Sequence, residues 1–66
     1  MTVEVRPSPD GWDVMHVGLL HQSYPRKQSA ESEARRLARK FGTELIIYRE
    51  NLSVQDIHRY PHNNGW

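Results

Sequence analysis

Basic side chains are the most concentrated chemistry-bearing groups in this sequence. Residues 26–40 contain six Lys or Arg and two Glu, which gives +4, whereas three bases and six acids give −3 elsewhere. Bases four residues apart project from the same face of a helix, so this segment predicts a basic ridge that can follow a phosphate backbone. The candidate nucleic-acid-binding residues are Arg26, Lys27, Arg35, Arg36, Arg39 and Lys40.

The same ridge can also be an ordinary solvated helix face. Glu31 is spaced to pair with Arg35, and Glu33 is spaced to pair with Arg36. Bases near the C-terminal end of a helix also complement its dipole. A net charge of +1 is weak for a dedicated nucleic-acid binder. Nucleic-acid binding is therefore the alternative function, not the leading one.

The four histidines raise the question of a metal site. His58 and His62 have a spacing that would suit zinc on a helix, but Pro61 separates them and His58 falls in a predicted strand. The sequence contains no cysteine. We expect no metal site, and we expect His16, His21, His58 and His62 to be exposed on strands and in the tail.

Catalytic motifs are missing from the sequence. It has no nucleophile elbow, phosphate-binding loop or dinucleotide fingerprint. Asp10 and Asp13 flank Trp12 at a turn, which does not assign them as an acid–base pair. A chain of 66 residues also has little volume for an enclosed pocket. We predict a non-enzyme with no catalytic residue, no cofactor and no small-molecule substrate.

One helix positions the basic ridge. Its apolar residues recur with a period of 3.6, which predicts a helix over residues 29–41. Ser29 is the expected N-cap, Glu31 and Glu33 fall in the first turn, and Gly42 follows the end. The apolar stripe consists of Ala30, Ala34, Leu37, Ala38 and Phe41.

Strands flank this helix on both sides. Alternation and apolar runs predict strands near residues 2–6, 12–17, 44–49 and 54–60, while residues 19–24 can be strand or loop. The predicted fold is α+β with the order ββαββ: an antiparallel sheet of three to four strands with one helix packed across one face. Residues 1–61 form a single domain, and 62–66 form a flexible C-terminal tail. The expected core contains Val3, Val5, Trp12, Val14, Leu37, Phe41, Leu45 and Ile47.

One face of this sheet should stay uncovered. The run Leu45–Tyr48 places apolar side chains on both faces, and a single helix can cover only one of them. The candidate protein-interface residues are Ile46, Tyr48 and Tyr60. The leading hypothesis is a non-enzymatic interaction module that binds a protein partner or forms a homodimer through a sheet face or edge.

The order of short motifs resembles a known family. Asp10-Gly11-Trp12-x-Val14 precedes a helix with Glu33-Ala34 and Leu37-Ala38-Arg39-Lys40, followed by Gly42-Thr43-Glu44-Leu45-Ile46-Ile47-Tyr48 and a late Tyr60. From about Val3 to Pro61 the chain resembles the small prokaryotic and phage-borne proteins of domain-of-unknown-function family 2188. The resemblance implies a ββαββ-like domain and no activity.

Two segments depart from the pattern of that family. Asn51-Leu52 stands where the family usually has Asp-Gly, which places a non-glycine residue in a turn that favours positive φ. His62-Asn63-Asn64 replaces an ending similar to Asn-Asp-Pro.

The hydropathy pattern bears on localisation. The longest apolar run is Leu45–Tyr48, whereas a membrane span needs roughly 20 apolar residues. The N-terminus lacks the basic and apolar segments of a secretory signal. We therefore expect no membrane partner and a cytoplasmic location.

Overall fold

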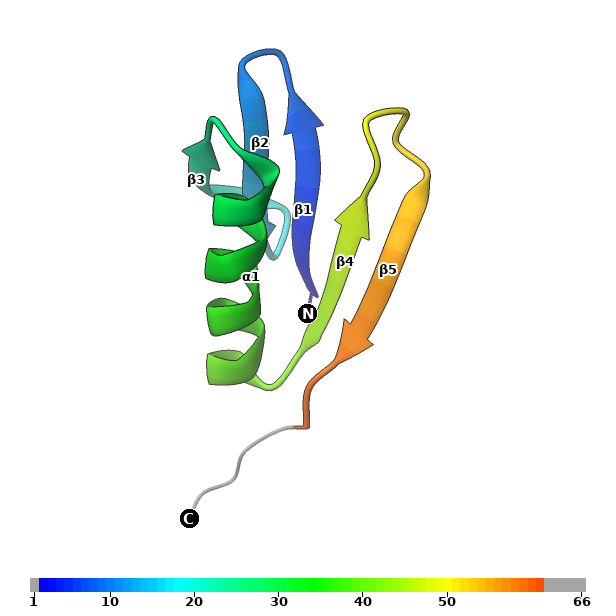
Figure 1. Ribbon diagram of the computed structural model, residues 1–66. Helices are drawn as coiled ribbons and strands as arrows, with labels where there is room; N and C mark the ends of the chain where they lie inside the picture. Colours follow the sequence, from blue (N-terminus) through cyan, green and yellow to red (C-terminus); the bar gives the residue numbers. More distant parts are fainter. Residues whose placement is uncertain (1, 62–66) are drawn as a thin grey trace.

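The computed structural model describes residues 2–61, so the predicted tail at 62–66 lies outside the described residues. Within these residues the fold is α+β, with one helix and five strands (Figure 1). The elements are β1 Thr2–Ser8, β2 Gly11–His16, β3 Leu19–Tyr24, α1 Lys27–Phe41, β4 Glu44–Tyr48 and β5 Val54–Arg59.

All five strands form one mixed sheet, with the order β3-β2-β1-β4-β5. Strand β1 is central and runs parallel to β4, with Val3 opposite Leu45 and Val5 opposite Ile47. The other neighbouring strands pair antiparallel. The predicted antiparallel sheet of three to four strands is thus wrong in both size and direction. The β1–β2–β3 meander occupies one side of β1, so the chain leaving α1 adds β4 at the free edge of β1, parallel to it.

The ambiguous segment at 19–24 is the strand β3. It pairs with β2 through the two-residue loop Val17–Gly18, so β2 ends at His16, one residue before the predicted end. Val17 has φ 53° and Gly18 has φ 75°. Two consecutive positive φ angles are the geometry of a tight hairpin turn, and a β-branched valine is unusual there. Because Val17 stands where such turns usually have Asn, Asp or Gly, the sequence does not indicate this hairpin.

The helix starts earlier than predicted. It begins at Lys27, and the N-cap Arg26 makes no side-chain capping hydrogen bond. Ser29 therefore lies inside the helix, and the first turn holds no acidic residue, which corrects both predictions. At the other end, Gly42 adopts φ 59° as predicted, and its N–H donates to the carbonyl of Ala38.

The core lies between α1 and the sheet. Six of the eight predicted core residues are buried there, and Trp12 is partly buried against them. Phe41 is 39% exposed, so its assignment to the core is wrong. It lies in the last helical turn, where its ring stacks on His16 at a centroid distance of 4.7 Å. The buried hydrophobic residues are Val3, Val5, Val14, Ala30, Ala34, Leu37, Ala38, Leu45 and Ile47.

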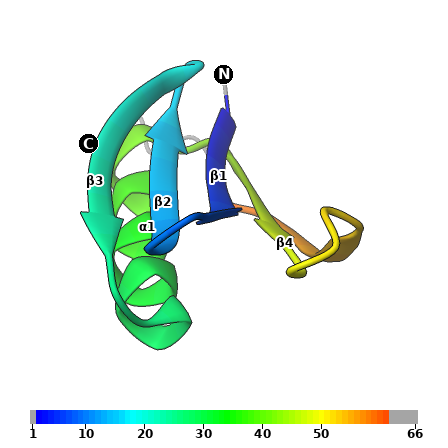
Figure 2. The same cartoon turned by 90° about the horizontal axis from the view of Figure 1, so that it is seen from above.

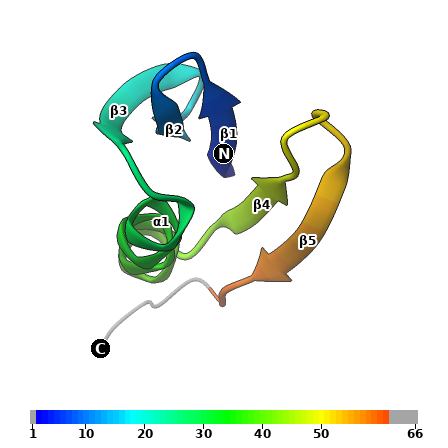
Figure 3. The same ribbon diagram turned by 45° about the horizontal axis from the view of Figure 1, so that its top comes forward.

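The helix does not cover the whole sheet. It packs against β1, β2, β3 and β4. Figures 2 and 3 show the β4–β5 hairpin extending beyond α1, on the side away from β3. In β5 every residue is exposed except His58, which is intermediate. Strand β5 is thus an edge strand that is open to solvent on both faces.

Candidate interaction surface

The predicted basic ridge is partly neutralised by its own helix. Arg35 Nη1 lies 3.3 Å from Glu31 Oε1. Arg36 donates to both oxygens of the Glu33 carboxylate, from Nε at 2.8 Å and from Nη2 at 2.6 Å. Both pairs have the predicted spacings. The two-pronged contact of Arg36 is the strong form of this interaction. The two arginines in the centre of the ridge, Arg35 and Arg36, are thus already paired.

Glu33 also joins the helix to β3. His21 Nε2 lies 2.9 Å from Glu33 Oε2. The hydrogen bonds from Arg36 and then from His21 lower the pKa of Glu33 from the usual 4.5 to about 2. The Glu33 carboxylate also raises the pKa of Arg36. His21 is the bulged residue of β3, between Leu20 and Gln22. These contacts form a polar clamp between strand and helix, which the sequence does not reveal because its partners are twelve residues apart.

Three other candidate phosphate-binding cations lie against aromatic rings. Lys27 lies 4.7 Å from the Trp12 ring centroid and also donates to Gln55 Oε1. Lys40 lies 5.5 Å from the ring of its neighbour Phe41.

Arg39 lies 5.9 Å from the ring of Tyr60, and its Nε donates to the carbonyl of Arg35. Within residues 2–61, no carboxylate lies within ion-pair distance of Arg26, Lys27, Arg39 or Lys40. The structure therefore divides the ridge into a paired centre and unpaired ends.

The predicted interface residues do not share one surface. Register places Ile46 beside Glu4 in β1 and Ile57 in β5, on the sheet face opposite α1. Tyr48 lies on the same face, where Arg6 stacks over its ring at 5.3 Å. Tyr60 packs against the helix-side core instead, so its predicted place on the uncovered face is wrong. Of the three predicted interface residues, Ile46 and Tyr48 therefore lie on the uncovered face and Tyr60 does not.

The edge of that face contains residues that sequence reasoning missed. Ile57 is 54% exposed and Val54 is 45% exposed, and they lie opposite Ile46 and Tyr48 respectively. Together these four side chains form an apolar patch on the β4–β5 hairpin. Strict alternation would place Val54 and Ile57 on opposite faces of β5. The extra residue at Gln55 shifts the register by one, so both side chains lie on the same face.

The three described histidines, His16, His21 and His58, lie on three different strands. His16 lies opposite Val3 and His58 opposite Leu45, so both side chains belong to the helix-side face. Their Nε2 atoms are buried without a hydrogen-bond partner, which corrects the expectation that these two are exposed. No group of three metal-ligating side chains occurs among residues 2–61. His62 lies outside this range.

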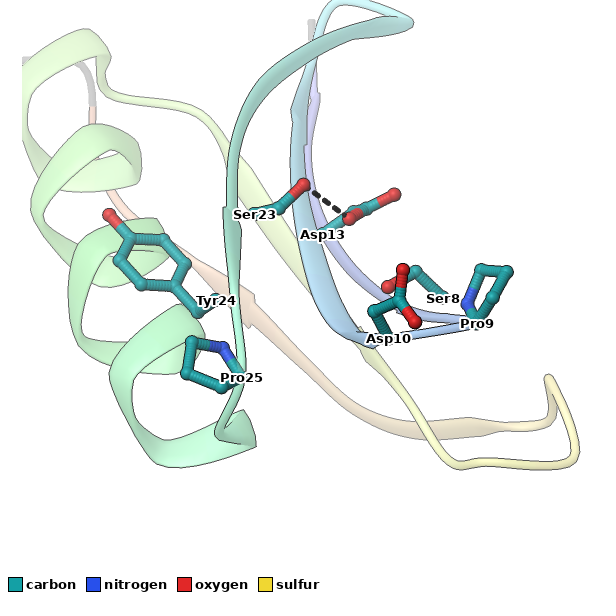
Figure 4. Close-up of a pocket in the computed structure, with 7 residues that line it drawn as sticks. All are labelled: Ser8, Pro9, Asp10, Asp13, Ser23, Tyr24 and Pro25. Carbon is teal, nitrogen blue, oxygen red and sulfur yellow. Dashed lines mark hydrogen bonds between the residues drawn. The ribbon is translucent and has the colours of Figure 1, made fainter.

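A polar hollow lies where the β1–β2 turn approaches the end of β3 (Figure 4). Its volume is about 410 Å³. The fold brings Asp10 and Asp13 to this hollow, and Ser23 Oγ donates to Asp13 Oδ1 at 2.8 Å. Asp13 is thus held by a neighbouring strand. The lining residues are Ser8, Pro9, Asp10, Asp13, Ser23, Tyr24 and Pro25.

The fold and the exposed hairpin define a small α+β domain with a free edge strand. The chain belongs to the family described as uncharacterized proteins conserved in bacteria (DUF2188), whose model matches residues 3–60. This confirms the resemblance found in the sequence. No curated protein and no solved structure matches the chain. Within residues 2–61, α1 is too short and too polar to cross a membrane.

Proposed function

We propose that this domain is a non-enzymatic protein-interaction module that binds through the β4–β5 hairpin. The observation that carries the proposal is the exposure of β5, an edge strand that α1 leaves uncovered and that bears Val54 and Ile57 on its outer face. A free edge offers backbone N–H and C=O groups to an incoming strand, and neighbouring apolar side chains add selectivity.

The opposite edge is a weaker candidate. Strand β3 is held to α1 by the His21–Glu33 contact and to β2 by the Ser23–Asp13 hydrogen bond. The helix also packs directly against β3. These contacts restrict the access of an incoming strand to β3. In β5, one described side-chain hydrogen bond joins the strand to the helix, from Lys27 to Gln55.

Nucleic-acid binding is the alternative proposal. Arg39 and Lys40 are exposed and have no carboxylate partner among residues 2–61, which favours an anionic ligand at the C-terminal end of α1. The paired state of Arg35 and Arg36 ranks this proposal second, because each must exchange a carboxylate for a phosphate.

Site-specific photo-crosslinking tests the leading proposal. In one variant a photoreactive amino acid replaces Ile57. In a matched control it replaces Gln22, on the β3 edge. Both variants are expressed and irradiated in the cells that produce the protein. We expect a specific protein adduct at position 57 only. The adduct partner is then purified, and its affinity is measured for the native chain and for Ile57→Pro. Adducts that are equal at both positions or absent from both overturn the proposal.

Mobility shifts at low salt test the alternative. Duplex DNA, single-stranded DNA and RNA serve as probes, and Arg35→Ala, Arg36→Ala and Arg39→Ala are combined in one variant. Binding by the native chain that is lost in this triple variant would replace the leading proposal if position 57 also gives no adduct. Binding that is absent, or unchanged in the triple variant, removes the alternative.

A further inference from the structure

The backbone of β5 alternates between groups that face β4 and groups that face solvent. The Tyr60 N–H donates to the Thr43 carbonyl at 3.3 Å, directly after the pair Glu44 and Arg59. Residues that bond in this way alternate along an antiparallel ladder with residues that do not. It follows that His58 faces β4 with its N–H and C=O, while Ile57 and Arg59 direct theirs outward.

The bulge at Gln55 limits the length of this free edge. Gln55 is the extra residue between Val54 and Asp56, and its side chain bonds to Lys27 on the helix side. The Val54 carbonyl already accepts from Arg49 Nη1 at 2.8 Å. The outward groups that remain in β5 beyond the bulge are those of Ile57 and Arg59. A partner strand must therefore pair along residues 57–59.

A second copy of β5 can pair with this edge in several antiparallel registers, and the side chains favour one of them. With Ile57 opposite its own symmetry mate, the outward groups of both residues bond to each other. Asp56 then faces His58 of the second copy, and the two-fold axis repeats this acid–base pair. Moving the two-fold axis by one residue, which shifts the pairing by two residues, places Asp56 opposite Asp56 in one direction and His58 opposite His58 in the other. The first alternative puts two carboxylates on the axis, and the second puts two imidazoles there and Ile57 opposite Arg59. The register centred on Ile57 instead puts two aliphatic side chains on the axis.

Apolar continuity supports the same register. Ile57 lies beside Ile46 on the uncovered face. With Ile57 at the axis, the row Ile46–Ile57 continues into the Ile57–Ile46 row of the second copy. The Ile57 side chain, which is 54% exposed in one chain, is then covered by its symmetry mate. Like charges are absent from the centre of this arrangement.

We infer that the chain forms a two-fold dimer by antiparallel pairing of β5 with β5, centred on Ile57. This inference rests on the proposed function and names a second copy as the partner. Pairing between identical edges closes after two copies, whereas pairing of β5 with β3 would propagate into a filament. The dimer joins two sheets into one and places the Asp56–His58 pairs on the helix-side face.

Disulfide trapping tests the register. Because the sequence contains no native cysteine, every disulfide must form between the introduced cysteines. Ile57→Cys places two cysteines across the axis at a Cα separation of about 5.5 Å, within disulfide range. We expect rapid oxidation to a dimer. Arg59→Cys lies four residues out of register with its mate, about 13 Å away, and should stay reduced under the same conditions. Equal trapping of both variants, or faster trapping of Gln22→Cys, overturns the register.

Sedimentation measures dimerisation without a crosslink. We expect a monomer–dimer equilibrium of the native chain between about 1 µM and 1 mM, the range of a small edge interface. Ile57→Lys should weaken it at least about tenfold, and Asp56→Lys about threefold to thirtyfold. Leu20→Lys is the matched control, since Leu20 on β3 is 58% exposed against 54% for Ile57. Circular dichroism confirms that each variant is folded.

The outcomes separate this inference from the function on which it rests. A native chain that stays monomeric throughout, while position 57 crosslinks to a different protein in cells, overturns the dimer and leaves the interaction module. A monomer with no adduct at position 57 overturns both. A dimer that Leu20→Lys dissociates and Ile57→Lys does not would place the interface at β3, and this overturns both the inference and the proposed site.

Discussion

The two edges of the sheet have the same strand length and different surroundings. Strand β3 is clamped to α1 through His21 and Glu33, and to β2 through Ser23 and Asp13. Strand β5 projects beyond the helix, and its residues other than His58 are exposed. The comparison teaches that one helix stabilises one side of a five-stranded sheet. The uncovered side retains hydrogen-bonding capacity that a partner can use.

The largest effect should come from the clamped side, at Gly11. Its φ is 154°, and a Cβ built there would lie 2.2 Å from the Tyr24 carbonyl oxygen. Gly11→Ala must therefore move the end of β3 away from β2, which should cost roughly 3 kcal/mol or more. Urea denaturation checks this value. Gly18→Ala, where nothing lies within 4 Å, is the control for the strain of positive φ alone.

The Glu33 clamp should contribute a smaller, pH-dependent part of the stability. Because the pKa of Glu33 falls from 4.5 to about 2 on folding, its contribution is present above about pH 4.5 and is lost as the pH falls toward 2. Glu33→Gln should cost about 1 kcal/mol at neutral pH, after allowance for solvent screening. Denaturation from pH 7 to 2 measures it. If the two proteins lose stability in parallel, the clamp does not act through the carboxylate.

Two of the three hairpin turns contain a non-glycine residue with a positive φ angle, one on each side of β1. Val17 has φ 53° and Leu52 has φ 70°. Val17→Asn creates the Asn-Gly pair preferred in such turns, and Leu52→Gly removes the steric cost of a side chain there. Each should raise the free energy of unfolding by about 1 kcal/mol. A decrease after Leu52→Gly would mean that the exposed Leu52 side chain makes a stabilising contact.

The smallest effect on stability should come from the surface of β5. Ile57→Thr keeps a β-branched side chain at a position that is 54% exposed, so the monomer should change by less than about 0.5 kcal/mol. Denaturation at low protein concentration measures this change. A loss of 2 kcal/mol or more would show that β5 is part of the folding core, which would remove the contrast between the two edges.

Local patterns in the sequence identified the parts of the fold that depend on neighbouring residues. The helix face, its end at Gly42, and the ion pairs of Arg35 and Arg36 all follow from spacings within one or two turns. The buried strands were found from alternation and apolar runs. The start of the helix was missed because Arg26 makes no side-chain cap, and β3 was left open because Val17 occupies a turn position that favours Asn or Gly.

Sequence alone determined where the helix ends, which of its residues form the ion pairs, and which strand residues are apolar, because these properties depend on the chemistry and spacing of nearby side chains. Tertiary structure alone decided that β4 pairs parallel to β1, that Tyr60 faces the helix side, that His21 reaches Glu33, and that β5 is left free. Those outcomes depend on which strand edge remains available after the chain has turned around the helix. Packing between segments that are distant in the sequence decides which edge is available, and the spacing of neighbouring residues does not indicate it.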